Sequence, residues 1–477
     1  MNPFAKGAEG SKFGRILPAQ GGSIFGGTST SALTTQHQNP SPSKNNKIIE
    51  EEDYQDYEET SVTEEFDPND LFTDNQIAID SLESYVSTVM EYLGYHNWTA
   101  TTLIAPLLSL DHDHVLCNFL QVENPDIVLD VNSSDEIYCE FVAAHISVCY
   151  YVAKEEWYKA YSMQMSMVTV FLKEIIQKSK DCNWFLPLLY PLCFDLRRLA
   201  KKAQATESNL DEDSTVDYND DVANQFMNIY RSCVSDNRLT LKESKKVAIF
   251  PLTLLLMQSY FESNKMALLK PLIRAIDNLS VSFKARIPLS ELVTYNFYLG
   301  KKAMFDSDLQ TADKSLEYAF KYCPEKYLEN KRRILIYWIP VKMFLGEIPL
   351  DSVLEDYNLN EFKIIAQGVR DGNIRYLRQG IISNRQFLMK SGVYLMFEKL
   401  AQLTYLALFK RLATIIGRPQ IKIEMFMHLL KFLGEDIRHI DEVVCVLSNL
   451  IAKKKIKGYI SKTHNTVVLS KISPFYE

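Results

Sequence analysis

The sequence of 477 residues lacks the features that mark several large classes of protein. No run approaches the ~18–20 consecutive apolar residues of a membrane span, and the first residues lack the apolar core of a signal peptide. The phosphate-binding loop, the G-x-S-x-G motif and the H-E-x-x-H motif are also missing. We therefore expect no membrane association, no small-molecule substrate, no cofactor and no enzymatic activity.

Cysteine and histidine are too dispersed to predict a metal site. The eight cysteines include no C-x-x-C pair, which is typical of reduced, buried thiols in an intracellular protein. The densest cluster runs from Asp111 to His114, with Cys117 just beyond. Residues two apart do not share a helix face, and no second Cys/His pair stands at ligand spacing. We expect a loop or a helix start there.

Charge is distributed unevenly along the chain. Residues 1–75 hold five Lys/Arg and thirteen Asp/Glu, and residues 203–221 hold seven acids and no base. Because the whole chain carries −8, the remainder carries +7. A mildly basic folded body is therefore predicted to carry two acidic segments, and local patches matter more for binding than the net charge does.

The first of these segments, residues 1–75, is predicted to be a disordered tail, Gly/Ser-rich and then acidic. It contains two Phe-Gly dipeptides, Phe13-Gly14 and Phe25-Gly26, which resemble the apolar motifs of nuclear-pore tails; chance occurrence is the alternative. Ten acids interleaved with aromatics occupy residues 50–67. That composition suits docking on a basic surface, or simple solubilisation. The second segment, 203–221, is predicted to be a flexible acidic insert.

Helical periodicity dominates the rest of the chain. Residues 76–202 form a predicted N-terminal helical domain, and residues 222–416 repeat helix pairs at a spacing of roughly 35–40 residues, as in helical-repeat proteins. The clearest pair, 293–324, resembles a tetratricopeptide repeat, with Gly300 and Ala312 small enough to let two helices approach closely. Further pairs are expected at 244–277, 331–357 and 361–390, and one long helix at 392–416. Stacked pairs predict a right-handed solenoid with an extended binding surface.

Residues 417–477 change pattern and predict a winged helix. One helix is expected within 421–434 and another over 441–451, opened by Asp441 as its N-cap. Two short strands follow around 456–460 and 467–469, with a turn at 462–465 between them. From Lys453 to Lys471 there are six lysines and no acid. The predicted fold class is mainly α: a helical-repeat solenoid capped by a C-terminal winged helix.

Several sequence blocks resemble the PCI domain-containing protein 2 family within the wider PCI family. They are KPLIRAID (270–277), YLGKKAMFDSD (298–308), KRRILIYWIPVKMFLG (331–346), IDEVVCVLSNLI (440–451) and KGYIS (457–461). This resemblance implies a PCI domain and a non-enzymatic subunit of a nuclear transcription-coupled mRNA export complex. It also implies pairing with a GANP-type helical scaffold and a small acidic DSS/SEM-type subunit, and winged helices that together bind RNA or DNA. A location in the nucleus, including the nuclear-pore region, follows from it, with contact to pore proteins and a cytoplasmic pool left open.

Two sets of basic residues are candidates for nucleic-acid binding. The winged helix supplies Lys453, Lys454, Lys455, Lys457 and Lys462, and the preceding repeat supplies Arg375, Arg378 and Arg385. Phosphate contact by such residues is independent of base sequence and weakens with salt. The alternatives to nucleic-acid binding are that these residues form a solvated basic surface, or that they bind the acidic small subunit.

Partner-binding candidates are aromatic. Tyr337, Trp338 and Phe344 lie in a nearly continuous apolar helix, for which a buried core is the alternative to a scaffold interface. Tyr459 lies on the first strand of the predicted hairpin. The rival function is a purely structural PCI subunit of a proteasome-lid or signalosome-like assembly that does not bind nucleic acid.

Overall fold

The computed structural model describes residues 13–15, 79, 81–123, 125, 136–179, 182–210, 217–236 and 243–475. Contacts divide the chain into one unit of Met1–Leu17 with Ser81–Glu477 and a second unit of Pro18–Asp80. The expectations for the tail therefore lie outside the described residues, except at Phe13–Arg15. No helix among the described residues is long and apolar enough to cross a membrane.

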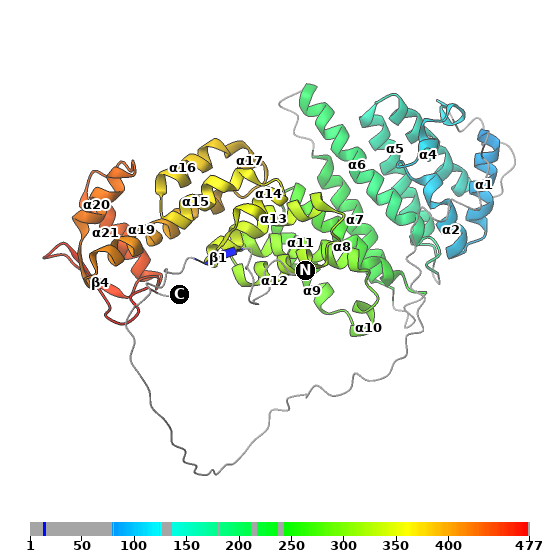
Figure 1. The fold of residues 1–477 in the computed structure, drawn as a ribbon. Coiled ribbons are helices and arrows are strands. Elements are labelled where there is room, and N and C mark those ends of the chain that lie inside the picture. The colour runs from blue at the N-terminus through cyan, green and yellow to red at the C-terminus, as the bar shows by residue number, and fades with distance from the viewer. Residues whose placement is uncertain are drawn as a thin grey trace, which may run out of the picture. The chain divides into compact units, whose positions relative to one another are not determined.

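Helices that pack on their sequence neighbours form the N-terminal part (Figure 1). The α-helices are α1 (Leu82–Gly94), α2 (Trp98–Ile104), α4 (Glu136–Ala153), α5 (Trp157–Val170), α6 (Leu186–Leu210) and α7 (Tyr218–Val234). Short turns add η2 (Ala105–Leu108), η3 (Asp113–Leu116), η4 (Asn118–Leu120) and the π-helical η5 (Phe171–Ile176). The helical stretches expected before residue 202 are confirmed. So is the helix start in the His-rich cluster, because η3 begins at Asp113.

The predicted flexible insert at 203–221 is wrong at both of its ends. Helix α6 continues to Leu210, and α7 already begins at Tyr218, so only residues 211–216 fall outside the described chain. The acids at the second end stabilise the start of α7. Asp217 accepts a hydrogen bond from the Asn219 N–H at 3.0 Å, and Asp220 and Asp221 lie in the first turn, where the helix dipole favours negative charge.

The helices of the predicted repeats follow, and helices lie within each of the expected pairs. Their elements are η6 (Lys245–Ala248), α8 (Ile249–Glu262), η7 (Met266–Leu268), α9 (Leu269–Asp277), α10 (Val281–Lys284), α11 (Leu289–Phe305), α12 (Leu309–Tyr322), α13 (Leu328–Phe344), α14 (Asp351–Asp356), η8 (Asn360–Phe362), α15 (Lys363–Asp371), α16 (Ile374–Ser383) and α17 (Arg385–Lys390). The close approach expected at Gly300 is confirmed, since a Cβ there would lie 2.6 Å from Leu316 Cγ of α12. A side chain at this position would push α11 and α12 apart.

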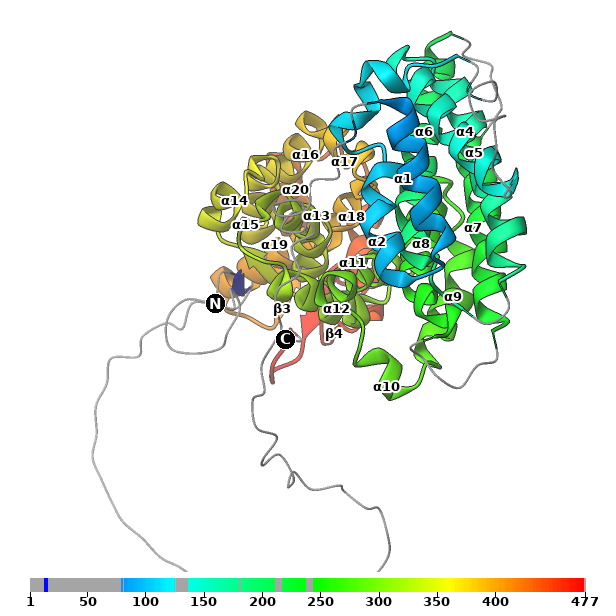
Figure 2. The same ribbon diagram turned by 90° about the vertical axis from the view of Figure 1, so that its right-hand side faces the viewer.

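The long helix expected at 392–416 is two helices, α18 (Tyr394–Lys399) and α19 (Ala401–Ile416). They meet at Leu400, whose side chain is fully buried. Helix α15 lies beside α19 in both views (Figures 1 and 2). Gly372 ends α15 at φ +64°, and a Cβ there would lie 2.6 Å from the backbone nitrogen of Leu408 on α19. Only glycine fits that contact without strain.

A winged helix closes the chain, as predicted. It comprises β3 (Gln420–Lys422), α20 (Ile423–Phe432), α21 (Ile440–Ala452), β4 (Gly458–Ser461) and β5 (Thr466–Leu469). The three strands are antiparallel in the order β3-β5-β4, and Val467 of β5 pairs with Ile421 on one side and Ile460 on the other. Val467 packs with Phe426 and Leu447 into one core together with Phe409 of α19. The fold class predicted from the sequence is thus confirmed.

The start of α21 differs from the prediction. The helix begins at Ile440 with His439 as its N-cap, so Asp441 lies within the first turn. Glu442 takes the capping role from inside the helix, because its Oε1 accepts the backbone N–H groups of Arg438 at 3.1 Å and His439 at 3.0 Å. These hydrogen bonds hold the pKa of Glu442 below its usual range.

One short strand lies in the predicted tail. Phe13–Arg15 forms β1 and pairs antiparallel with β2 (Glu347–Pro349), which links α13 to α14. The expectation of a tail without structure is therefore wrong for these three residues, since backbone pairing needs no hydrophobic periodicity in the strand itself.

Candidate nucleic-acid and partner interface

The lysines of the winged helix gather where α21 ends and the chain turns toward the hairpin. Lys454 N–H bonds to the Ile451 carbonyl and Lys455 N–H to the Leu450 carbonyl, both at 2.9 Å, which is a Schellman cap. Lys454 sits at the left-handed position of that cap with φ +54°, where glycine is usual. The backbone therefore presents Lys454 outward at some cost in conformational strain.

These lysines are not equivalent. The Lys453 ammonium donates a hydrogen bond to Gln402 Oε1 of α19. The backbone N–H of Lys457 donates to the Pro474 carbonyl oxygen at 2.7 Å and so holds the C-terminal segment against the start of the hairpin. Lys454 and Lys462 are exposed, and Lys455 is half-buried. No ion pair of the described residues involves Lys454, Lys455 or Lys462. We call these three the wing lysines; a phosphate could approach them without displacing a carboxylate of the described residues.

The rest of α21 limits where nucleic acid could lie. Its exposed face carries Cys445, Ser448 and Asn449, which are uncharged, and its first turn carries Asp441 and Glu442. A helix of 13 residues spans about 20 Å, so acids and lysines stand at opposite ends. A helix-turn-helix that reads bases uses the N-terminal residues of this helix. Acids at that end repel phosphate, so the geometry favours contact through the lysine end and the hairpin.

The arginines predicted to extend this surface are engaged elsewhere. Arg375 donates from Nε to Leu433 O at 3.1 Å and from Nη2 to Phe432 O at 3.0 Å, which satisfies carbonyls at the end of α20. Arg385 lies over the Tyr394 ring, 6.0 Å from its centroid. The sequence placed these side chains on a helix face but could not reveal their partners.

Arg378 joins the repeat to the winged helix. Its Nε lies 2.5 Å from Glu435 Oε1, and its Nη2 donates to Glu435 Oε2 at 2.8 Å. The Tyr405 hydroxyl donates to the same Oε2 at 3.0 Å, and burial together with this carboxylate raises the pKa of Tyr405. Arg375 and Arg378 thus hold the link between α20 and α21 against α16 and do not continue the surface of the wing lysines.

Three of the four aromatic partner candidates belong to the core, the alternative that the sequence left open. Trp338 is fully buried and donates from Nε1 to Asp313 Oδ1 at 2.7 Å. Tyr337 and Phe344 are partly buried against the same core, and the Tyr337 ring lies 5.6 Å from Phe297. Tyr459 is 63% exposed on the outer face of the wing sheet. Of the four, Tyr459 alone is exposed.

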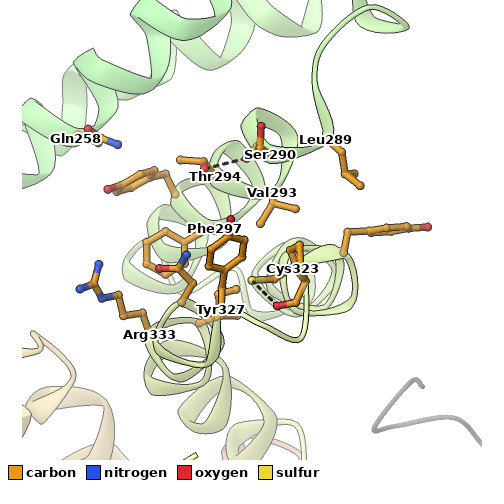
Figure 3. A pocket seen from close by; sticks show the side chains of 14 residues that line it. Gln258, Leu289, Ser290, Val293, Thr294, Phe297, Cys323, Tyr327 and Arg333 are labelled. Atoms are coloured by element: carbon orange, nitrogen blue, oxygen red, sulfur yellow. Dashed lines mark hydrogen bonds between the residues drawn. The ribbon is translucent and has the colours of Figure 1, made fainter. Parts of the chain in front are cut away.

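Sequence patterns did not point to a pocket that opens between α11, α12 and α13 (Figure 3). It holds about 560 Å³ and is lined mostly by apolar and aromatic side chains, among them Leu289, Phe297, Tyr322 and Tyr327, with Arg333 at one side. These residues come from three helices and a link, so periodicity within one helix could not assemble them. A pocket of this kind suits an apolar side chain of a partner protein.

Comparison with known proteins places this architecture in a family. The PCI domain family matches residues 354–471, which run from α14 through the winged helix and include the wing lysines. A Caenorhabditis elegans protein called PCI domain-containing protein 2 homolog is 42% identical over 403 residues, covering 83% of this chain and 97% of its own length. This chain belongs to the PCI domain-containing protein 2 family.

The relationship extends across eukaryotes. PCI domain-containing protein 2 of Danio rerio is 35% identical and covers 83% of this chain and 97% of its own length. A Schizosaccharomyces pombe protein called Protein CSN12 homolog is 26% identical over the same shares of both chains. PCI domain proteins are generally non-catalytic scaffold subunits of complexes, and no enzyme family is indicated.

The described residues contain no group of three His, Cys, Asp or Glu side chains arranged to hold a metal ion. His114 and His145 lie with ring centroids 6.1 Å apart, and burial lowers the pKa of His145 to about 3 and raises that of Cys149. Burial therefore favours the neutral forms of His145 and Cys149.

Proposed function

We propose that this PCI scaffold subunit works in a nuclear, transcription-coupled mRNA export complex and binds RNA or DNA through its wing lysines. The observation that carries the nucleic-acid part is the position of Lys454 and Lys455 at the end of α21 and of Lys462 in the hairpin turn, without a carboxylate partner among the described residues. Contact of this kind is with phosphate and independent of base sequence. The complex and its nuclear location rest on the resemblance of the sequence blocks.

The test replaces all three wing lysines by Glu and measures binding of a fluorescent single-stranded RNA over a series of salt concentrations. Each lost phosphate contact reduces the slope of log K against log salt by about 0.7 for a single strand, so the triple variant loses a slope of about 2. We expect its affinity at low salt to fall by more than about tenfold.

The matched control replaces Lys314, Lys321 and Lys326, exposed residues on α12 and in the link to α13, by Glu. Both variants change the net charge by the same amount, so a loss confined to the wing variant assigns binding to that surface. Equal loss in both variants, or unchanged affinity in the wing variant, would contradict the nucleic-acid role and leave the purely structural reading.

The scaffold part of the proposal is supported by the apolar pocket between α11, α12 and α13. We propose that a side chain of a partner subunit, of the GANP or DSS/SEM type, inserts there. Leu289→Glu places a charge at the pocket rim and should reduce recovery of partners in affinity purification. Val281→Glu, at an 84% exposed position on α10, is the control and should leave recovery unchanged.

Identification of the recovered proteins tests the complex itself. A GANP-type scaffold with nuclear proteins would support the export role. Recovery of proteasome or signalosome subunits in their place would overturn it, whatever the wing variant does with RNA.

A further inference from the structure

The three-stranded sheet of the winged helix has an outer face that the hydrophobic core does not use. Successive residues of a strand point to opposite sides of the sheet. The inner side belongs to the core, where Ile421 of β3 and Val467 of β5 are buried. On the opposite side the register places Gln420 of β3, Val468 of β5 and Tyr459 of β4 in one row across the sheet. Tyr459 is 63% exposed and Gln420 is exposed, so this row faces solvent.

The outer face carries basic and uncharged side chains. Its next row consists of Lys422 of β3, Thr466 of β5 and Ser461 of β4, and Lys462 follows Ser461 directly. Lys422 and Lys462 are both exposed. Residues 420–422 and 453–471, which supply the three strands and the turn, contain no Asp or Glu. The charge of this face therefore complements a polyanion.

An exposed aromatic ring lies between lysines on this face. Lys455 precedes β4 along the chain, Tyr459 lies within β4, and Lys462 follows it. Lys462 is three residues beyond Tyr459, which is roughly 10 Å along an extended strand. The order of cation, ring and cation matches a nucleic-acid strand, in which phosphates flank each base.

The ring also favours one form of nucleic acid. A base of any identity can stack on an aromatic side chain, so stacking requires no particular sequence. In a duplex, however, the neighbouring bases already cover the faces of each base. A ring on the surface of a sheet therefore reaches only bases that are unpaired. Strand β4 is at the edge of the sheet, in the order β3-β5-β4, which leaves Tyr459 without a neighbouring strand on one side.

We propose that the outer face of the wing sheet binds single-stranded nucleic acid, with an unpaired base stacked on Tyr459 and phosphates on Lys422 and Lys462. This inference deepens the proposed nucleic-acid role and rests on it. The wing lysines bind the phosphates of any nucleic acid, and Tyr459 adds a preference for single strands.

Variants of Tyr459 in the full chain test the stacking, with labelled single-stranded oligothymidine as the probe. Tyr459→Ala should weaken binding by at least about fivefold, which corresponds to the lower end, about 1 kcal/mol, of the range for base–aromatic stacking. Tyr459→Phe keeps the ring and should bind as the unaltered chain does. The Ala variant should leave the slope of log K against log salt unchanged, because no phosphate contact is lost, whereas Lys422→Glu should lower that slope by about 0.7.

Two further probes separate stacking from phosphate contact. An abasic strand with the same number of phosphates, and a duplex of the same length, should bind Tyr459→Ala and the unaltered chain equally. An equal loss with all three probes would overturn the stacking inference. So would full affinity of Tyr459→Ala for oligothymidine, including the case in which this variant recovers fewer proteins in affinity purification, because the face would then bind a protein partner.

The same measurements distinguish this inference from the proposed function. If the variant with all three wing lysines replaced by Glu keeps its affinity, the nucleic-acid role itself is wrong. If that variant binds weakly and Tyr459→Ala binds fully, only the stacking on Tyr459 is wrong.

Discussion

The junction of Arg378, Glu435 and Tyr405 should be what holds the winged helix against the repeat, and its two ends should respond differently to mutation. The Glu435 side chain is 10% exposed, whereas the Arg378 side chain is 59% exposed. Removing Arg378 leaves a mostly buried carboxylate with the Tyr405 hydroxyl as its remaining side-chain donor. Removing the charge of Glu435 leaves a guanidinium that water can solvate.

The magnitudes follow from that asymmetry. A hydrogen bond to a charged group contributes about 1.5–3 kcal/mol, and the exposed position of Arg378 reduces the value of the pair. We expect Glu435→Gln to cost about 1 kcal/mol, because Gln keeps the shape and one acceptor. Arg378→Met should cost about 2–3 kcal/mol, because it leaves the carboxylate uncompensated.

The assay is native-state hydrogen exchange of the α20 and α21 amides, because a chain with several helical segments does not unfold in one step. A double-mutant cycle between Arg378→Met and Glu435→Gln should give a coupling of about 1–2 kcal/mol. Asp436→Asn, in the exposed pair with Arg438, is the control and should cost less than about 0.5 kcal/mol. A larger cost for Glu435→Gln than for Arg378→Met, or a coupling near zero, would refute the reasoning.

Three further predictions concern single positions. Gly372→Ala should lower the free energy of unfolding by more than about 2 kcal/mol, because the new Cβ would clash with the α19 backbone and the residue would keep a positive φ. Gly417→Ala, also at a left-handed helix end but with open space around it, should cost only about 1 kcal/mol. Thermal unfolding midpoints compare the two variants, and equal shifts would contradict the packing argument. Burial raises the pKa of Asp195 from 3.8 to about 7, so the folded chain keeps a proton that the unfolded chain releases as pH rises. The free energy of unfolding should therefore fall between about pH 4 and pH 7, by at most about 4 kcal/mol, and Asp195→Asn should flatten this part of the stability profile; an unchanged profile would show that Asp195 is not its source. Lys454→Gly should raise stability by up to about 1 kcal/mol through relief of its positive φ, yet weaken RNA binding; loss of stability would mean that the Lys454 side chain also packs.

Local patterns predicted the elements that depend on short-range chemistry. The helix of α21, the two strands of the hairpin and the turn between them all follow from periodicity and turn residues, and Gly300 correctly marked a close helix contact. Some element boundaries were missed. The expected long helix is interrupted at Leu400, and the acids after residue 216 begin a helix that the acidic composition had not indicated.

For the candidate site, too, the sequence determined some features and the tertiary structure determined others. The sequence by itself determined that lysines cluster after α21 without an acid, since this needs only the order of residues. The tertiary structure decided which cations remain available: Arg375 and Arg378 face the α20–α21 link, whereas Lys454, Lys455 and Lys462 do not pair with a carboxylate among the described residues. It also decided that the first Phe-Gly segment pairs with β2. The physical reason is common to both. A charge or a strand edge acts through whichever group lies within a few ångströms, and the fold brings groups that close from distant parts of the chain.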